Sequence, residues 1–353
     1  MSPHAAKEGR TTWYATFPAG FSDLIVRILR EDDPAVSVTA SFDDAVVFDL
    51  PSSRRRAVQG PYFHNVFVVL DRVELPGSSA GVEGAFSVFA ERLPAYKLQE
   101  ALRPYRSFRL VVSDENRLVS VDAGIRDSLE RAISGDGRTP IHNRNPATEI
   151  WVAKRRDGLC LFMLRVPGST PRRTGLPKGA LTPQVGSLLC RLSNPTGEDV
   201  FLDPFCGHGG IFVERLRWKY RLAFALDEDP DCIREVKARL QERSRQWRSR
   251  TYVRQGDGTR LTGFSDGFVS SIVTDPPWGL YDRGVRDLDS FYTEMLGSFA
   301  RVLAMHGRLV VLVARDIPLE ALAARSTSSF RMQESMPVLI NGRKASVYRL
   351  EKQ

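Results

Sequence analysis

Residues 199–210, DVFLDPFCGHGG, decide the fold of the C-terminal half of this chain. An apolar run ends at the acidic Asp203, small residues follow, and a helical pattern begins at Gly210. A strand, a glycine turn and a helix in this order let a ligand approach the backbone of the turn. The glycine spacing differs from the Gly-x-Gly-x-x-Gly of dinucleotide sites, which favours a ligand without a pyrophosphate. Taken alone, the stretch is equally compatible with a purely structural turn.

The same alternation of strand and helix patterns continues to the end of the chain. Apolar runs predict strands, amphipathic stretches predict helices, and Asn341-Gly342 is a strong hairpin signal. Repeated strand–helix units with a closing hairpin indicate an α/β domain, a Rossmann-like, mostly parallel sheet with an antiparallel edge. The predicted strands are Asp199–Phe205, Leu222–Asp227, Thr251–Gln255, Phe268–Thr274, Arg308–Ala314, Met332–Ile340 and Ser346–Leu350, and the predicted helices are Gly210–Trp218, Asp231–Arg245 and Leu288–Ala304.

The N-terminal half mixes strands and helices in an α+β pattern, without that regular alternation. A stretch rich in Pro, Gly and Arg, Val166–Gly179, is the candidate domain boundary. We therefore expect an α+β region at 1–168, a linker at 169–182 and the Rossmann-like domain at 183–353. Upstream strands are predicted at Thr12–Phe17, Ala45–Leu50, Val66–Val73, Phe108–Val112, Glu149–Lys154 and Leu159–Val166, with helices near Phe21–Arg30, Phe86–Leu93 and Ile125–Ile133.

Acidic residues stand at the ends of the first three predicted strands of the C-terminal domain. The carboxyl ends of parallel strands share one edge of a sheet, where α/β folds bind their ligands. Asp203 or its neighbours could meet the amino group of a methionine moiety, Asp227 could bind ribose hydroxyls, and Asp257 could accept from an adenine amine. Each carboxylate alone is more often a cap or turn residue. Together they predict a site for S-adenosylmethionine.

The fourth strand runs into Asp275-Pro276-Pro277-Trp278. An exocyclic amine on a nucleobase is a poor nucleophile, because its lone pair is delocalised into the ring. The Asp275 carboxylate and a proline-fixed carbonyl, that of Pro276, can accept its two N–H bonds and aim the lone pair at a sulfonium methyl group. Pro277 stiffens the turn, and Trp278 offers a face on which a base taken out of its stack can lie. The alternative is a plain Pro-Pro turn followed by a core aromatic residue.

Three motifs together resemble those of the THUMP-containing, class I S-adenosylmethionine-dependent tRNA guanine-N2 methyltransferases. They are the linker GLPKGALTP at 175–183, the loop DPFCGHG at 203–209 and the turn DPPWG at 275–279. The resemblance extends from about Gly175 to the end of the chain, and the N-terminal part is similar in outline to a ferredoxin-like and THUMP module. The resemblance implies a tRNA substrate presented by that module, S-adenosylmethionine as the cofactor, and no metal.

The resemblance also implies a cofactor pocket and a flap at Lys178–Thr182. The residues expected to bind the cofactor are Lys178, Thr182, Asp203, Pro204, Phe205, Cys206, Gly207, Gly209, Asp227, Glu228, Asp257 and Gly258. This chain has His208 and Gly210 where the family usually has Ser and Thr, so one hydroxyl contact to the cofactor is expected to be lost. We expect His208 to be a spacer that faces solvent. Tyr or Phe is more usual in the family than Trp278.

The composition of the chain limits the classes of partner and ligand that we expect for it. A net charge of +8 attracts polyanions, so nucleic acid is the first partner to consider. The four cysteines form no Cys-x-x-Cys pair and the five histidines show no ligand spacing, so neither disulfides nor a metal site are expected. No apolar run approaches the length of a membrane span, and the N-terminus lacks a signal-peptide pattern. We therefore expect a cytoplasmic protein without a membrane partner, most simply a monomer.

These observations favour a methyltransferase that acts on guanine N2 in tRNA. Asp-Pro-Pro-Trp also serves enzymes that methylate adenine N6 or cytosine N4 in DNA, or amino groups in rRNA, so those substrates are alternatives. Another interpretation is a pseudo-enzyme that binds RNA without methylating it, which the departures at His208 and Gly210 would explain.

Overall fold

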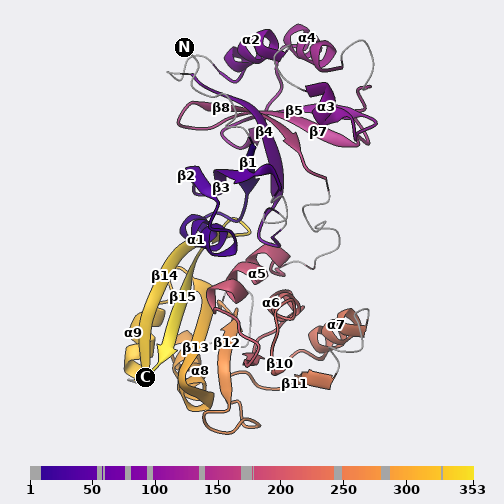
Figure 1. Ribbon diagram of the computed structural model, residues 1–353. Coiled ribbons are helices and arrows are strands. Elements are labelled where there is room, and N and C mark those ends of the chain that lie inside the picture. Colours follow the sequence, from indigo (N-terminus) through magenta and orange to yellow (C-terminus); the bar gives the residue numbers. More distant parts are fainter. Residues whose placement is uncertain are drawn as a thin grey trace. The chain divides into compact units, whose positions relative to one another are not determined.

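The computed structural model describes residues 9–53, 58, 60–75, 81–93, 98–134, 140–167, 177, 179–241, 249–279, 287–326 and 329–353. They form two compact units, one made of Met1–Thr16 with Val26–Thr170 and the other of Phe17–Ile25 with Pro171–Gln353. No helix in the described ranges is long and apolar enough to cross a membrane. Figure 1 shows the elements of both units along the chain.

The first unit is built on an eight-stranded sheet in the order β2-β3-β1-β4-β8-β7-β5-β6. Its one parallel pair among the described strands is β5 with β7. Helices α2, α3 and α4 cover the β5, β7 and β8 part of the sheet with a cluster of Phe and Leu side chains. The α+β prediction is thus confirmed for this unit. Its elements are β1 (Arg10–Thr16), the part of α1 (Ser22–Asp32) from Val26 onward, β2 (Ser37–Phe42), β3 (Ala45–Pro51), β4 (Asn65–Glu74), α2 (Glu83–Arg92), α3 (Leu98–Leu102), β5 (Phe108–Asp114), β6 (Arg117–Leu118), α4 (Ala123–Ser134), β7 (Thr148–Lys154) and β8 (Leu159–Arg165).

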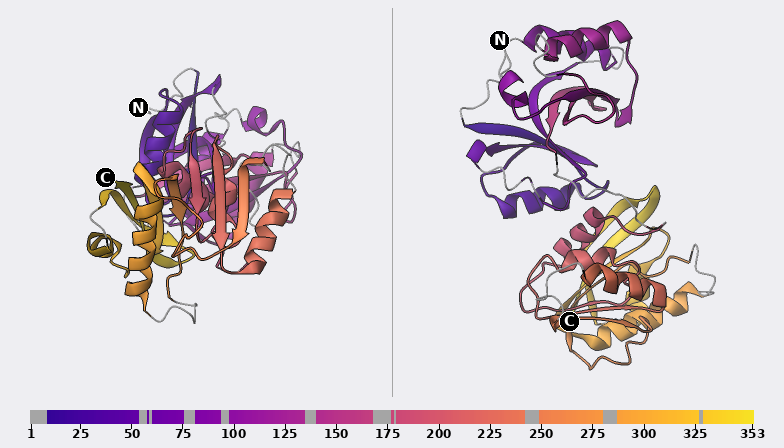
Figure 2. Two further views of the ribbon diagram at one scale, coloured as in Figure 1. Left: turned by 90° about the horizontal axis from the view of Figure 1, so that it is seen from below. Right: turned by 90° about the vertical axis from the view of Figure 1, so that its right-hand side faces the viewer.

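The second unit is built on a seven-stranded sheet in the order β11-β10-β9-β12-β13-β15-β14. Strands β9 to β13 are parallel, and the β14–β15 hairpin adds an antiparallel edge. Figures 1 and 2 show helices on both faces of this sheet, with α5, α6 and α7 on one and α8 and α9 on the other. The elements are α5 (Pro183–Leu192), β9 (Val200–Asp203), α6 (Gly210–Arg215), β10 (Leu222–Asp227), α7 (Pro230–Gln241), β11 (Thr251–Gln255), β12 (Val269–Thr274), α8 (Leu288–Val302), β13 (Leu303–Ala314), α9 (Leu319–Ser326), β14 (Phe330–Ile340) and β15 (Arg343–Lys352).

The predicted α/β fold with an antiparallel edge is confirmed, while several predicted bounds are wrong. Strands β10 and β11 have the predicted limits, but α6 ends at Arg215 because Leu216 already caps it. Strand β13 begins at Leu303, directly after α8, because Leu303 is extended and pairs with Val269 of β12. Elements β2, α3, β6 and α9 were not predicted. The predicted helix 231–245 is α7 as far as Gln241, and 242–245 lie outside the described residues.

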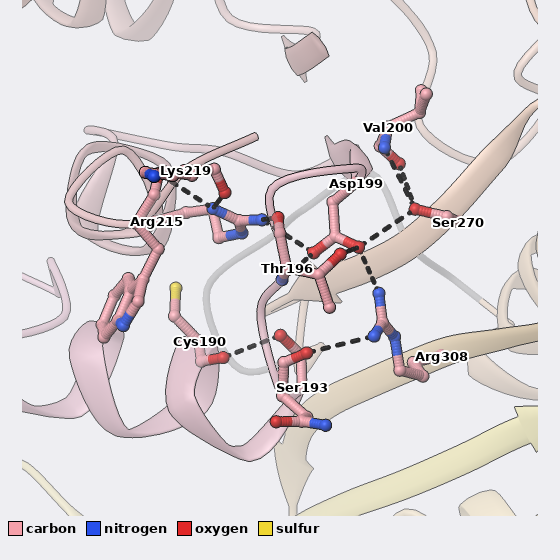
Figure 3. Close-up of polar contacts among 11 residues, drawn as sticks. Cys190, Ser193, Thr196, Asp199, Val200, Arg215, Lys219, Ser270 and Arg308 are labelled. Atoms are coloured by element: carbon pink, nitrogen blue, oxygen red, sulfur yellow. Dashed lines mark hydrogen bonds and ion pairs between the residues drawn. The ribbon is translucent and has the colours of Figure 1, made fainter. Parts of the chain in front are cut away.

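A buried ion cluster joins the amino ends of the central strands (Figure 3). Asp199, just before β9, is 1% exposed and accepts from Arg215 at 2.7 Å, from Arg308 of β13, and from Ser270 of β12 at 3.3 Å. The Thr196 backbone and hydroxyl also donate to it, each at 2.9 Å. Burial alone would raise the pKa of Asp199, but these hydrogen bonds and the two arginine charges outweigh it and hold the pKa below its usual value. The cluster therefore holds the central strands together at their amino ends, opposite the carboxyl ends where the site lies.

Candidate cofactor and substrate site

The strand order of the second unit reverses at β9, which lies between β10 and β12. Asp203 is the last residue of β9, and Asp275 follows Thr274, the last residue of the parallel neighbour β12. Asp227 is the last residue of β10, and Asp257 comes shortly after β11. In open α/β sheets ligands bind outside the carboxyl ends of the strands at such a reversal. The sheet thus brings these four acids to the edge where this fold binds its ligands.

The Asp203 side chain is fully buried at this edge. Its Oδ1 accepts a 3.0 Å hydrogen bond from Thr274 Oγ1, while its Oδ2 has no hydrogen-bond partner among the described residues. Burial, joined by the nearby charges of Asp227 and Asp275, raises the pKa of Asp203 well above its usual value, although the Thr274 bond acts in the opposite direction. A cationic donor beside Oδ2 would restore the charged form and satisfy the orphaned oxygen.

The loop after β9 is held by its own backbone and by β10. Cys206 N donates to Leu226 O at 2.8 Å, Gly209 N donates to Cys206 O at 2.7 Å, and Gly207 N donates to Asp227 Oδ2 at 2.7 Å. Gly207 has a φ of +45°, and a Cβ added there would meet no atom within 4 Å. A ligand can therefore reach the backbone of the loop at Gly207, and Asp227 also orders the loop.

The expectation that His208 is a spacer facing solvent is wrong. Its Nδ1 lies 2.6 Å from Glu235 Oε2 of α7, and 32% of its side chain is exposed. Arg239, one helical turn further along α7, donates to the His208 carbonyl oxygen. Helix α7 thus bonds His208 twice: the Glu235 carboxylate contacts its imidazole ring, and the Arg239 guanidinium contacts its backbone carbonyl. His208 thus ties the glycine loop to α7.

The expected flap is described only in part. Lys178 lies outside the described residues. Thr182 is buried and caps α5 by accepting from Val185 N at 3.4 Å, so its hydroxyl has a helix-capping role. A Cβ added to Gly210 would lie 3.1 Å from Leu181 Cβ, so a larger residue at 210 would push against this segment. A side chain at 210 would therefore require Leu181 to shift by a few tenths of an ångström.

The segment after β11 packs under the glycine loop. Asp257 Oδ1 accepts from the Thr259 backbone and hydroxyl at 2.8 and 2.5 Å. A Cβ added to Gly258 would lie 2.3 Å from Pro204 O and 2.8 Å from the Phe205 ring, so glycine is required for this packing. Glu228 is exposed, and its carbonyl oxygen accepts from Gln255 Nε2 at 2.9 Å.

The Asp-Pro-Pro-Trp turn is anchored at both ends. Trp278 Nε1 donates to Asp275 Oδ1 at 2.9 Å, and Tyr292 of α8 donates its hydroxyl to Pro277 O at 2.8 Å. The residue Asp275 keeps some exposed surface, yet the protein around its carboxyl group excludes enough water to raise its pKa to about 7, against the opposite influence of the Trp278 bond. No hydrogen bond to the Pro276 carbonyl occurs among the described residues. The turn therefore combines the partly exposed Asp275 with the carbonyl group of Pro276, a buried residue whose carbonyl no described residue bonds.

Contacts between side chains of this site were not predicted, among them the following three. Thr274 holds Asp203, Tyr292 holds Pro277, and Glu235 holds His208. A threonine directly before Asp275 on the same strand was the available signal for the first contact. All three join residues from different elements, and for the other two the local sequence patterns carry no sign of the contact.

Comparison with known proteins finds likenesses to the domain that carries this site. Residues 171–346 match the RMKL-like methyltransferase domain family. A tRNA (guanine(10)-N2)-dimethyltransferase of Methanothermobacter thermautotrophicus is 29% identical over 168 residues, 46% of this chain and 48% of that protein. The matched stretch thus spans about half the length of this curated relative.

Solved structures match over nearly the whole chain. TrmN from Thermus thermophilus has a TM-score of 0.76 at 21% identity, covering 97% of this chain and 100% of that one. A second structure, described as a methyltransferase in complex with SAH, has a TM-score of 0.71 at 14% identity, covering 98% and 99%. The second unit therefore has the class I methyltransferase fold, and the methyltransferase match indicates S-adenosylmethionine as its cofactor. No cluster of three or more metal-ligating side chains occurs within the described residues.

Proposed function

We propose that this protein transfers a methyl group from S-adenosylmethionine to the exocyclic amine of a nucleobase, namely guanine N2 in tRNA. The observation that carries the proposal is the juxtaposition of Asp203 and Asp275. Both carboxyl groups come from adjacent parallel strands at the point where the strand order reverses. The first suits the cationic end of the cofactor, and the second suits the amine that receives the methyl group.

The residues at the sheet edge fit the cofactor in charge and in space. The orphaned Oδ2 of Asp203 would accept from the methionine ammonium group, and the open backbone at Gly207 leaves room for the ligand. Asp227, already bonded through Oδ2 to the loop, has a second oxygen that accepts from Asp229 N and lies where ribose hydroxyls are expected. Asp257 and Gly258 would line the adenine side.

The Asp-Pro-Pro-Trp turn would hold the target amine. Asp275 and the Pro276 carbonyl accept its two N–H bonds, and Trp278 stacks on the base, as expected for a base removed from its stack. When bound, S-adenosylmethionine supplies an electrophilic methyl group, whose bond to sulfur breaks as the bond to nitrogen forms, with the electron pair left on sulfur. The proton then lost by the nitrogen passes to Asp275. With a pKa of about 7, Asp275 can accept and release this proton near neutral pH.

The proposal that the substrate is tRNA is supported by the similarity of this chain to tRNA methyltransferases. The relative named above acts on guanine N2 of tRNA according to its name, and the linker 175–183 resembles that of tRNA enzymes. The net charge of +8 favours a polyanionic partner. We propose that the first unit is a THUMP-like module that binds tRNA, followed by a linker at 169–182 and the catalytic domain at 183–353. A tRNA substrate would place the enzyme in the cytoplasm.

The test is transfer of tritium from methyl-labelled S-adenosylmethionine to unmodified tRNA, followed by nucleoside analysis. We expect label in N2-methylated guanosine, and a loss of about 10²- to 10⁴-fold in Asp275→Ala with cofactor affinity largely intact. Asp289→Ala is the matched control, because Asp289 is 63% exposed on α8 and its ion pair with Arg325 is a surface contact of little energy.

The same assay separates the alternatives. Label in adenine N6 or cytosine N4 of DNA, or in rRNA, would replace tRNA as the substrate while keeping the reaction. An absence of cofactor binding in calorimetry would contradict the enzyme and support an RNA-binding pseudo-enzyme. The ratio of one to two methyl groups on the product decides between mono- and dimethylation.

A further inference from the structure

The indole of Trp278 makes a contact that stacking does not require. Its Nε1–H donates to Asp275 Oδ1 at 2.9 Å across the two intervening prolines. A phenylalanine at this position could stack on a base equally well, but it has no donor. The indole N–H is therefore a feature that this chain adds to the aromatic position of the turn.

The geometry of this contact is fixed from several sides. The two prolines restrict the backbone between donor and acceptor. The Trp278 ring packs against the hydrophobic core of the second unit, and the fully buried Tyr292 holds the Pro277 carbonyl. The indole N–H is thus held toward a single acceptor, Oδ1 of Asp275.

The two oxygens of Asp275 are consequently unequal. Oδ1 accepts from Trp278, whereas Oδ2 accepts no hydrogen bond from any described residue. The titratable groups that face the carboxyl group are Asp203 from β9 and Tyr292 from α8. Neither is a cation, so the indole N–H is the contact among described residues that favours the charged carboxylate.

We propose that Trp278 is a positioning residue for Asp275: its indole N–H fixes Oδ1, so Oδ2 receives an N–H of the substrate amine and, after methyl transfer, the proton of that amine. This inference rests on the proposed function. It gives Trp278 a task in addition to stacking, and it predicts that removing the N–H alone changes the acidity of Asp275.

The test variant is Trp278→Phe, which keeps an aromatic ring and removes the donor. In protein labelled with ¹³C at the aspartate carboxyl carbons, the Asp275 resonance is assigned by its absence in Asp275→Asn. We expect its titration midpoint to rise by about one pH unit in Trp278→Phe, because a hydrogen bond to the charged form is lost. The acid limb of the pH–rate profile should move upward equally, with kcat rather than the KM for S-adenosylmethionine affected on the plateau.

Asp289→Ala is the control, since it changes an exposed residue of α8 without touching the turn or the carboxyl group; its midpoint should stay at the wild-type value. The wild-type protein gives a second readout if the variant is unstable, because the Trp278 indole ¹⁵N–¹H signal, one of five, should titrate with Asp275 and cease to do so in Asp275→Asn. An unchanged midpoint in Trp278→Phe, or an indole signal that ignores pH, would overturn the proposal. Titration as expected in a protein that methylates no nucleic acid would instead sink the proposed function alone.

Discussion

At the scale of single residues, burial of the Asp275 carboxyl group lowers the stability of the folded protein when that group is charged. Burial raises the pKa of Asp275 to about 7, far above the value of about 3.9 for an aspartate in an unfolded chain. Between these two values the unfolded chain gives up the proton more readily than the folded protein does. The folded state therefore loses stability as the pH rises from about 4 to about 7, and does not regain it above.

Asp275→Asn should consequently stabilise the protein while impairing catalysis. The amide can still accept from Trp278 but carries no charge to bury. We expect the melting temperature of the variant to exceed that of wild type at pH 8, by about 2–4 °C for each kcal/mol gained, and the difference to vanish near pH 4. Thermal unfolding across this pH range measures it, and a variant less stable than wild type at pH 8 would show that the carboxylate is not under strain.

Gly207 offers a second prediction at this scale. A methyl group there projects into open space at the loop that we expect to face the cofactor, and the φ of +45° costs an alanine about 1 kcal/mol. Gly207→Ala should thus fold, yet bind S-adenosylmethionine at least about tenfold more weakly. Calorimetric titration beside a melting curve checks both points. Unchanged affinity would place the cofactor elsewhere.

At the scale of elements, the strands and their ends could be predicted from sequence, whereas contacts between elements could not. Apolar runs fixed the limits of β10 and β11 because local alternation and flanking turns suffice there. The α8–β13 junction was misplaced, since Leu303 is extended through pairing with Val269, a partner distant in sequence. The hydrogen bond between His208 and Glu235 was not predicted for the same reason, because nothing in the sequence near residue 208 indicates which helix will pack against it.

The contact between the glycine loop and α7 carries its own prediction. His208→Ala removes the partner of Glu235 and loosens the loop that Gly207 and Asp227 hold. Because a half-exposed pair contributes only about 1 kcal/mol, we expect a roughly fivefold loss of affinity for S-adenosylmethionine. Glu235→Gln keeps a hydrogen-bond acceptor and should lose less. A His208→Ala protein with wild-type affinity would mean that the loop keeps its conformation without the contact between the His208 side chain and Glu235.

At the scale of the whole molecule, the second unit separates stability from chemistry on the two edges of one sheet. The carboxyl ends of its strands gather acids with raised pKa values, while the amino ends are joined by Asp199, Arg215 and Arg308. The pKa of Asp199 lies below its usual value, so this carboxylate, unlike Asp275, stabilises the fold when charged. Its contribution is complete above the unfolded pKa of about 3.9 and is lost as the pH falls through the lower folded value.

Asp199→Asn should therefore be among the most destabilising substitutions in the second unit. It would leave the fully buried Arg215 and the nearby Arg308 without their shared counter-charge, at a cost of about 3–5 kcal/mol. Urea unfolding measures the loss, with Asp289→Asn as the exposed control. Because the cluster lies at the edge opposite the site, variant protein that remains folded should bind S-adenosylmethionine as wild type does. A urea midpoint equal to that of wild type would mean that the arginines gain as much from their backbone carbonyl partners as from Asp199, and that the cluster does not hold the sheet.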